Sequence, residues 1–200
     1  MAPAERADIV IDFSKYPHGT RLYLVNRLLM KDGRGPEGLS SRGEQLLRFD
    51  IDTDPMELDV SRVPARLREL PPINLNDVVR TRRWEFDKDN AIWTVNKKIF
   101  DPEKAAAVVK RNSAEIWELR GNGSWHHPVH VHMEEVRILS RNGVPPPPHE
   151  QGRKDVIVLK PDERVKVFIR FRDFTGKYLL HCHNLSHEDH AMMARWDVVA

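Results

Sequence analysis

Residues 164–171 have the sequence Arg-Val-Lys-Val-Phe-Ile-Arg-Phe, in which an apolar side chain recurs at every second position. The recurring residues are Val165, Val167, Ile169 and Phe171. Lys166 and Arg170 lie between them. Successive side chains of a β-strand point to opposite faces of a sheet, so the pattern predicts a strand with one buried and one exposed face. A second sheet must cover the buried face, which favours a β-sandwich.

Seven further segments of similar character lie beyond residue 80. They are residues 82–88, 91–96, 115–120, 131–140, 155–160, 177–182 and 194–199. Short strands at regular spacing are typical of an antiparallel sandwich, here with about eight strands. Asp101–Lys110 is predicted as a short helix between two of them.

The first 80 residues are organised differently. Strands are predicted at 7–13, 20–29 and 46–52, which are rich in apolar and β-branched residues. Three strands are too few to cover an apolar sheet face, so we expect part of a domain rather than a whole one. Residues 54–80 hold four prolines and predict a linker, with a helical turn at Val63–Leu70.

The composition excludes several classes of protein. Charged residues make up 31% of the 200 residues, but the net charge is only +2 and no Lys- or Arg-rich run occurs, so no nucleic-acid partner is expected. No apolar run reaches about 18 residues, so no transmembrane helix and no membrane partner are expected. The first residues lack the basic and apolar segments of a signal peptide, and localisation stays unknown. Cys182 is the only cysteine, which rules out a disulfide within the chain.

Two histidine clusters carry the chemistry. Residues 125–132 are Trp-His-His-Pro-Val-His-Val-His, and residues 181–193 are His-Cys-His-Asn-Leu-Ser-His-Glu-Asp-His-Ala-Met-Met. In an extended strand, His181 and His183 point away from Cys182. His130 and His132 share a face by the same rule, and His127 has the opposite parity unless Pro128 breaks the extended geometry. The clusters therefore predict two centres on opposite sides of one strand end.

The first centre contains His127 and Cys182. A tight loop after residue 183 can return His187 and Met192 toward the sulfur, which gives a thiolate, two imidazoles and a thioether. This ligand set is typical of a blue-copper electron-transfer site. Zinc is the rival metal, but zinc has no use for a thioether and more usually binds paired cysteines.

The second centre consists of imidazoles alone, those of His130, His132, His181 and His183. Four imidazoles suit copper that binds and reduces dioxygen. The peptide bonds between Cys182 and its two histidine neighbours offer a route for electrons between the centres.

These motifs carry a family resemblance. "HHPVHVH" and "HCHNLSHEDHAMM" resemble the last two copper motifs of multicopper oxidases, and the chain is similar to the bacterial laccase, bilirubin oxidase and phenoxazinone synthase branch. "APAERADIVIDF" resembles the closing part of the middle cupredoxin domain. The resemblance implies a partial cupredoxin domain at 1–60, a linker at 61–80 and a complete, all-β, Greek-key cupredoxin sandwich at 81–200.

The resemblance also implies a role for each residue of the two centres. The type 1 copper ligands are His127, Cys182, His187 and Met192. Family spacing selects Met192 over Met193, which is then expected to fill the core. The type 2 ligand is His130, and the type 3 ligands are His132, His181 and His183. Glu188 matches an acid that helps to deliver protons; its alternative is a solvated loop charge.

The implied activity is one-electron oxidation of phenolic, aminophenolic, tetrapyrrole or metal-ion donors, coupled to reduction of dioxygen to water. In the family the oxygen-reducing cluster also takes HxH pairs from the first domain, and His18 is the only histidine before His126. We therefore expect the missing N-terminal domains to come from a longer parent chain or a partner, and the isolated chain to be inactive toward oxygen. Two other hypotheses are a type 1 electron-transfer module without oxygen chemistry, and a truncated product or misplaced gene start.

The remaining candidates are expected to be structural. The histidines without a role are His126, His149 and His190. The tryptophans expected in the core are Trp117, Trp125 and Trp196. Glu134 and Glu135 are expected to cap or solvate a strand.

Overall fold

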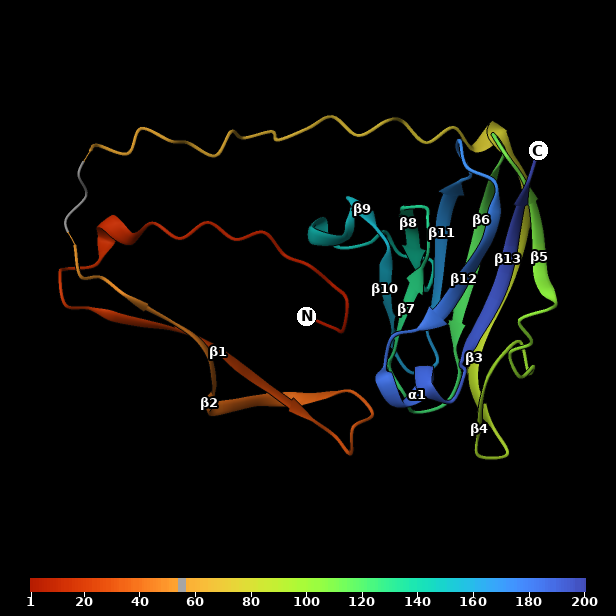
Figure 1. Ribbon diagram of the computed structural model, residues 1–200, viewed down its shortest axis with the longest axis horizontal. Coiled ribbons are helices and arrows are strands. Elements are labelled where there is room, and N and C mark those ends of the chain that lie inside the picture. The colour runs from red at the N-terminus through yellow and green to blue at the C-terminus, as the bar shows by residue number, and fades with distance from the viewer. Residues whose placement is uncertain (54–56) are drawn as a thin grey trace. The chain divides into compact units, whose positions relative to one another are not determined.

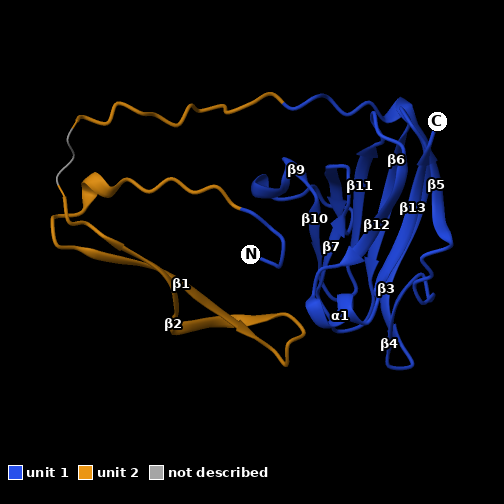
Figure 2. Cartoon of the chain, in the orientation of Figure 1, with its two compact units in different colours: residues 1–6, 70–200 blue, residues 7–69 orange. Residues whose placement is uncertain are grey.

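The computed structural model describes residues 1–53 and 57–200 and separates into two compact units (Figure 2). One unit comprises residues 7–69, and the other comprises residues 1–6 and 70–200. The linker predicted at 54–80 begins in residues 54–56, which lie outside the described residues. Among the helices of the described residues, none is long and apolar enough to cross a membrane.

The unit of residues 7–69 is built on one antiparallel hairpin (Figure 1). Its strands are β1 (Arg21–Met30) and β2 (Pro36–Asp50). Lys31 N donates to Gly35 O over 2.9 Å and closes the turn between them. The strand predicted at 20–29 is confirmed, and the one predicted at 46–52 is the end of a much longer strand.

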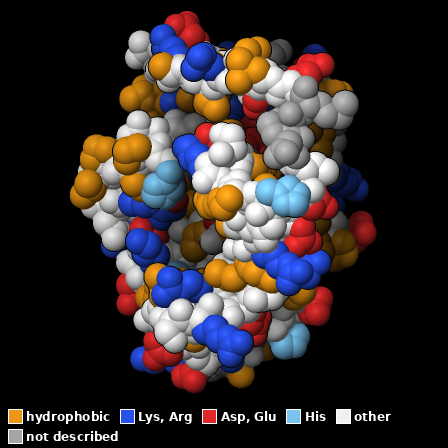
Figure 3. Space-filling model, turned by 90° about the vertical axis from the view of Figure 1, so that its left-hand side faces the viewer, with side chains coloured by type: hydrophobic (Ala, Val, Ile, Leu, Met, Phe, Trp, Pro, Cys, Tyr) orange, Lys and Arg blue, Asp and Glu red, His pale blue; other side chains and the backbone are white. Residues whose placement is uncertain are grey.

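Two predictions in this unit are wrong. Residues 7–12 form no strand, because no described segment pairs with their backbone; a 3₁₀ turn, η1 (Phe13–Lys15), follows, and the Asp12 side chain caps it by accepting from Ser14 N. Val63–Leu70 is not helical, since so short a helix needs packing and Leu67 is 80% exposed. Exposed apolar side chains such as Ile9 and Leu46 are common in this unit, and such side chains lie among charged ones on the face drawn in Figure 3.

Residues 70–200 form a two-sheet sandwich (Figure 1). The six-stranded sheet has the order β4-β3-β6-β11-β8-β9, with β3 at Val78–Asp89, β4 at Ile92–Val95, β6 at Ala114–Gly121, β8 at Val136–Arg141, β9 at Arg153–Lys154 and β11 at Arg164–Arg170. The five-stranded sheet has the order β10-β7-β12-β13-β5, with β5 at Ala105–Lys110, β7 at His127–Val131, β10 at Val156–Leu159, β12 at Gly176–Cys182 and β13 at Met193–Val199. The helical segments are η2 (Leu75–Asp77), η3 (Pro148–Glu150) and α1 (Leu185–Asp189).

The core lies between the two sheets and draws large side chains from both. Trp84 and Trp117 come from the six-stranded sheet, and Leu180 and Trp196 from the five-stranded one; all four are buried. On β11 the alternation has the predicted effect, since the apolar positions are buried and Lys166 is exposed. The all-β sandwich and the core positions of Trp117 and Trp196 are therefore confirmed.

Three details differ from the prediction. Asp101–Lys110 is not a helix: its second half is β5, whose Ala107 and Val109 are buried by the sandwich, so tertiary packing overrides the helix propensity of alanine. The sandwich is not wholly antiparallel, because β5 pairs in parallel with β13, and β3 with β6. The strand predicted at 131–140 is broken between β7 and β8, where Met133 adopts a positive φ of 74°.

Glu134 holds this break together. Its carboxylate is 2% exposed and accepts from Arg172 N over 2.7 Å and from Arg172 Nε over 2.8 Å. Glu135 beside it is exposed and pairs with Arg153 over 2.9 Å. Glu134 therefore ties the turn that follows His132 to the segment after β11, whereas Glu135 is a surface charge.

Glu134→Ala is expected to lower the free energy of unfolding by about 1.5–3 kcal/mol, because it removes hydrogen bonds to a buried charge. Glu135→Ala is the matched control and is expected to change it by less than about 0.5 kcal/mol. Urea unfolding of both variants measures the difference. Equal losses would contradict a structural role for the buried carboxylate.

Candidate metal centres

The pairing of β7 with β12 sets the geometry of both centres. His181 lies directly opposite His130, and Cys182 lies opposite Val129. Cys182, Val129 and His127 are completely buried on the core side of the sheet. Strand β7 stays extended through Pro128, so His130 takes the other face, as residue parity predicts.

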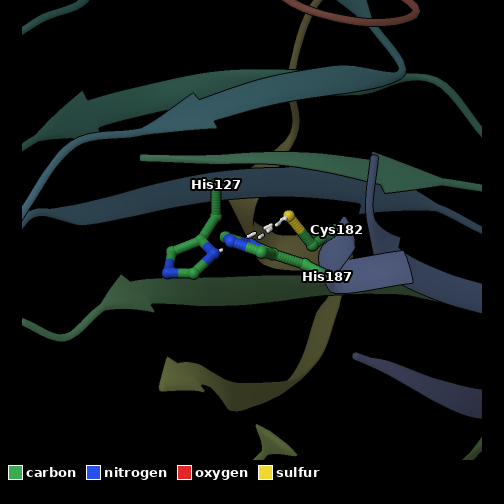
Figure 4. Close-up of side chains that lie close together, drawn as sticks. All are labelled: His127, Cys182 and His187. Atoms are coloured by element: carbon green, nitrogen blue, oxygen red, sulfur yellow. Dashed lines mark hydrogen bonds between the residues drawn. The ribbon is translucent and has the colours of Figure 1, made fainter. Parts of the chain in front are cut away.

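The first centre is a buried group of three side chains (Figure 4). Cys182 Sγ lies 3.6 Å from His127 Nδ1 and 3.4 Å from His187 Nδ1. The three atoms lie within 4.8 Å of one another. One thiol and two imidazoles from three separate elements thus converge on one point.

Helix α1 brings His187 back to the sulfur. The Asn184 side chain caps the helix by accepting from Ser186 N over 3.2 Å. Met192 N then donates to His187 O over 3.0 Å, and Cys182 N donates to Met192 O over 3.1 Å. Met192 is fully buried, and its main chain is hydrogen-bonded to two members of the group.

Met193 differs from its expected role. It begins β13 opposite His181, is half-buried and lies outside the core cluster. The alternation of β13 turns the next residue, Ala194, inward instead, so the expectation that Met193 fills the core is wrong.

Burial keeps the first group uncharged. It lowers the pKa of His127 to about 3, with further lowering by His187 and His126, and it lowers that of His187 to about 4, with further lowering by Lys88 and His190. It raises the pKa of the Cys182 thiol to about 12. A metal cation between these atoms would offset the burial of a thiolate, and a thiolate with two imidazoles is a donor set that soft metals prefer. The residues therefore fit a copper ion.

The second centre lies on the opposite face of the sheet. One ligand atom from each of His130, His132 and His181 lies within 4.8 Å of the others, and His132 Nε2 is 3.0 Å from His181 Nε2. The His183 ring lies 5.3 Å from the His181 ring and 5.9 Å from the His130 ring, centroid to centroid. The four imidazoles predicted for the second centre are thus brought together.

Hydrogen bonds orient these rings. His130 Nδ1 donates to Asp155 O over 2.9 Å, and His181 Nδ1 donates to Cys182 O over 3.2 Å. Both bonds leave Nε2 of the ring for the other histidines. Burial lowers the pKa of His132 and of His181, which favours the neutral ring, the form that can bind a metal ion.

Glu188 contacts the second centre from α1. Its carboxylate oxygens lie 3.4 Å from His183 Nδ1 and 3.8 Å from His181 Nδ1, and its side chain is 30% exposed. His187 and Glu188 are adjacent in α1, so one short helix carries a member of each centre.

Residues 72–200 match the protein family described as multicopper oxidase. The chain belongs to the multicopper oxidase family. It is 36% identical over 206 residues to a bilirubin oxidase from Albifimbria verrucaria, across 98% of the chain and 35% of that relative. It is 34% identical over 202 residues to a laccase from Haloferax volcanii, across 96% of the chain and 33% of that relative.

A variant of the multicopper oxidase McoA from Aquifex aeolicus has a similar fold. Its crystal structure aligns with a TM-score of 0.78 and 24% identity, over 95% of this chain and 43% of that one. The chain spans about a third of the length of the two curated multicopper oxidases above. Family membership implies copper; the assignment of each residue to a copper type stays a prediction.

The sequence interpretation missed two residues of this multicopper oxidase chain, Trp93 and Lys88. The Trp93 indole stacks on the His187 ring at 3.6 Å between centroids, with the planes 28° apart, and Lys88 Nζ lies 4.8 Å from the Trp93 ring. Trp125, which was expected in the core, is only half-buried and packs against the core. Its ring forms a T-shaped pair with the His187 ring, with 5.2 Å between centroids. The pairing of β3 with β4, which places Lys88 opposite Trp93, would have identified both residues, but this pairing is known only from the structure.

His126, His149 and His190 belong to neither candidate metal group. His149 and His190 are exposed, as expected for surface residues, and His126 is half-buried.

The copper-free chain is expected to lose stability as the pH falls from about 6.5 to 4. The unfolded chain binds a proton at His127 and His187 below their ordinary pKa of about 6.5, whereas the folded chain does not until about 4 or lower. Each ring therefore contributes up to about 1.4 kcal/mol of lost stability per pH unit. Urea unfolding across this range measures the slope.

His127→Leu should reduce this slope by up to one proton, and His149→Gln should leave it unchanged. A slope for His127→Leu equal to that of the unmodified chain would show that His127 is not held neutral by the fold.

Proposed function

We propose that this chain is the copper-binding C-terminal part of a multicopper oxidase. The proposed type 1 copper ligands are His127, Cys182, His187 and Met192. The proposed type 2 and type 3 ligands are His130, His132, His181 and His183. The observation that supports the proposal is the end of β12, where His181 and Cys182 belong to two different groups of side chains that could each hold a metal ion, on opposite faces of one sheet.

Copper bound at these groups would supply one-electron oxidation of a small-molecule donor and reduction of dioxygen to water. The chain's own residues would fix the geometry of that transfer. The hydrogen bond from His181 Nδ1 to Cys182 O and the peptide bond between them connect the two groups directly. Glu188, within 3.8 Å of His181 and His183, would hold and pass a proton beside the oxygen site.

The proposed enzyme needs parts beyond these 200 residues. The curated relatives are about three times as long as the matched region, which supports a need for further cupredoxin domains that donate the remaining histidines. Residues 1–60 are proposed as the end of the middle cupredoxin domain, 61–80 as the linker and 81–200 as the complete third domain. The donors proposed are phenols, aminophenols, tetrapyrroles or metal ions, and no nucleic acid or membrane takes part.

A second candidate is a type 1 electron-transfer module without oxygen reduction. It is favoured by one observation: the Cys182 group is assembled wholly from residues of this chain. The two candidates differ in oxygen uptake with a phenolic donor, once the chain is completed with the N-terminal domains of a relative. Uptake identifies an oxidase, and a blue protein without uptake identifies the module.

Cys182→Ser is expected to abolish the intense blue colour of the copper-loaded chain, because the colour requires a copper–thiolate bond. His130→Ala is the matched control and should keep the colour, since His130 belongs to the other group. Visible absorption measures both. A Cys182→Ser variant that is still blue would contradict the assignment of Cys182 to a type 1 copper site.

Glu188→Gln is expected to lower oxygen uptake by the completed enzyme about 10²-fold, because an amide cannot transfer the proton. Bleaching of the blue colour by donor without oxygen should be unchanged. Glu188→Asp should recover part of the rate and shift its pH profile. Asp189→Asn, at the exposed neighbour, is the control. Oxygen uptake by Glu188→Gln at the unmodified rate would contradict the proton-transfer role and show that Glu188 is only a surface charge.

A further inference from the structure

Two indole rings cover the His187 side of the proposed type 1 site. Trp93 stacks on His187, and Trp125 forms a T-shaped pair with each of these rings, with centroids 5.2 Å from His187 and 5.0 Å from Trp93. His187 itself has no exposed surface, whereas Trp125 is only half-buried. Within the described residues, a molecule that approaches His187 from this side meets the indoles before it meets the imidazole.

Lys88 places a positive charge on these indoles. Its Nζ lies 4.8 Å from the Trp93 ring and 5.7 Å from the Trp125 ring, within the range of cation–π attraction. Lys88 pairs directly with Trp93 across the β3–β4 hairpin. One lysine therefore contacts both rings that lead to His187.

The position of Lys88 on β3 explains how a charge comes to lie there. Alternation places Trp84, Phe86 and Lys88 on one face of the strand. Trp84 and Phe86 are buried in the core, and the ring centroids of Phe86 and His127 are 6.0 Å apart. The third residue on this face, Lys88, is exposed. Strand β3 therefore places a positive charge at the edge of the core, beside the proposed ligand group.

The Lys88 ammonium has no carboxylate partner in the described part of the chain. The ion pairs formed by the described residues do not include Lys88. Asp87 and Asp89 are its neighbours in sequence, but alternation turns both to the opposite face of β3. Asp87 instead accepts from the Lys88 main-chain N–H over 2.8 Å. The ammonium is thus available to an anion at the indoles.

We propose that Lys88, Trp93 and Trp125 form the docking site for the electron donor, and that this site selects aromatic donors that carry a carboxylate or sulfonate. The donor's ring would pack against the half-buried indole of Trp125, and its anionic group would pair with Lys88. Lys88 is then the residue that determines the charge class of the donor. This inference rests on the proposed function, because it assigns the donor side of the proposed type 1 site.

Binding can be tested without copper, oxygen or turnover. Naphthalene-2-sulfonate, an aromatic anion that serves as the probe, is titrated into the ¹⁵N-labelled, copper-free chain. The indole N–H signals of Trp93 and Trp125 are expected to shift. Those of Trp84, Trp117 and Trp196, which are buried in the core, serve as internal controls and should stay in place.

Lys88→Gln keeps a long polar side chain and removes the charge. It is expected to weaken sulfonate binding about threefold to fivefold, the scale of one exposed ion pair. Binding of the neutral naphthalene-2-sulfonamide should be unchanged, and Lys88→Arg should restore the sulfonate affinity. Lys166→Gln, at an exposed lysine of β11, is the matched control and should bind as the unmodified chain does.

The same variants can be compared after copper loading. Bleaching of the blue colour by an anionic phenol should be about threefold to fivefold slower in Lys88→Gln at limiting donor, and by a neutral phenol equally fast. Blue protein with equal rates for both phenols in both variants would overturn the docking site and leave the proposed function standing. A colourless protein whose Trp93 and Trp125 signals still respond to the sulfonate would overturn the copper assignment alone. Core indoles that shift as much as Trp93 and Trp125 would overturn the docking site.

Discussion

The register between β7 and β12 is the constraint on which both groups of candidate ligands depend. Backbone hydrogen bonds fix His181 opposite His130 and Cys182 opposite Val129. Because side chains alternate, a slip of one residue would turn the thiol outward and an imidazole into the core. The buried apolar face resists such a slip, since Leu180 and Val131 pair beside the candidate ligands and are packed between the sheets. Packing of the core therefore fixes the register of β7 and β12, and this register fixes the positions of the candidate ligands.

The sequence was sufficient where the signal was local. The alternation of β11 and the parity of the two histidine motifs each depend on a few neighbouring residues, and both have the predicted geometry. The break at Met133 was missed because a positive φ and the long-range contact from Glu134 to Arg172 leave no periodic pattern. The helix predicted at 101–110 failed for the same reason: β5 exists because it pairs with β13, which lies about ninety residues later.

The surroundings of His187 show a similar division. Its place in the motif could be recognised from spacing, but the indole that stacks on it comes from β4 and the nearby ammonium from β3. These contacts join residues almost one hundred positions apart. Nothing within either segment distinguishes Trp93 from an ordinary core residue. The residues of the two proposed ligand groups could thus be identified from the sequence, whereas the side chains that pack around His187 could be identified only from the fold.

Helix α1 has a consequence for how such a protein can change. Five residues carry His187 toward one face of the sheet and Glu188 toward the other. A substitution that rotates or shifts this helix must therefore disturb both faces at once. Changes in α1 should show strong epistasis, and improvement of one centre through this segment would come at the expense of the other. Substitutions in the β3–β4 hairpin have more freedom, because it contacts His187 but makes no ring contact with His130, His132, His181 or His183.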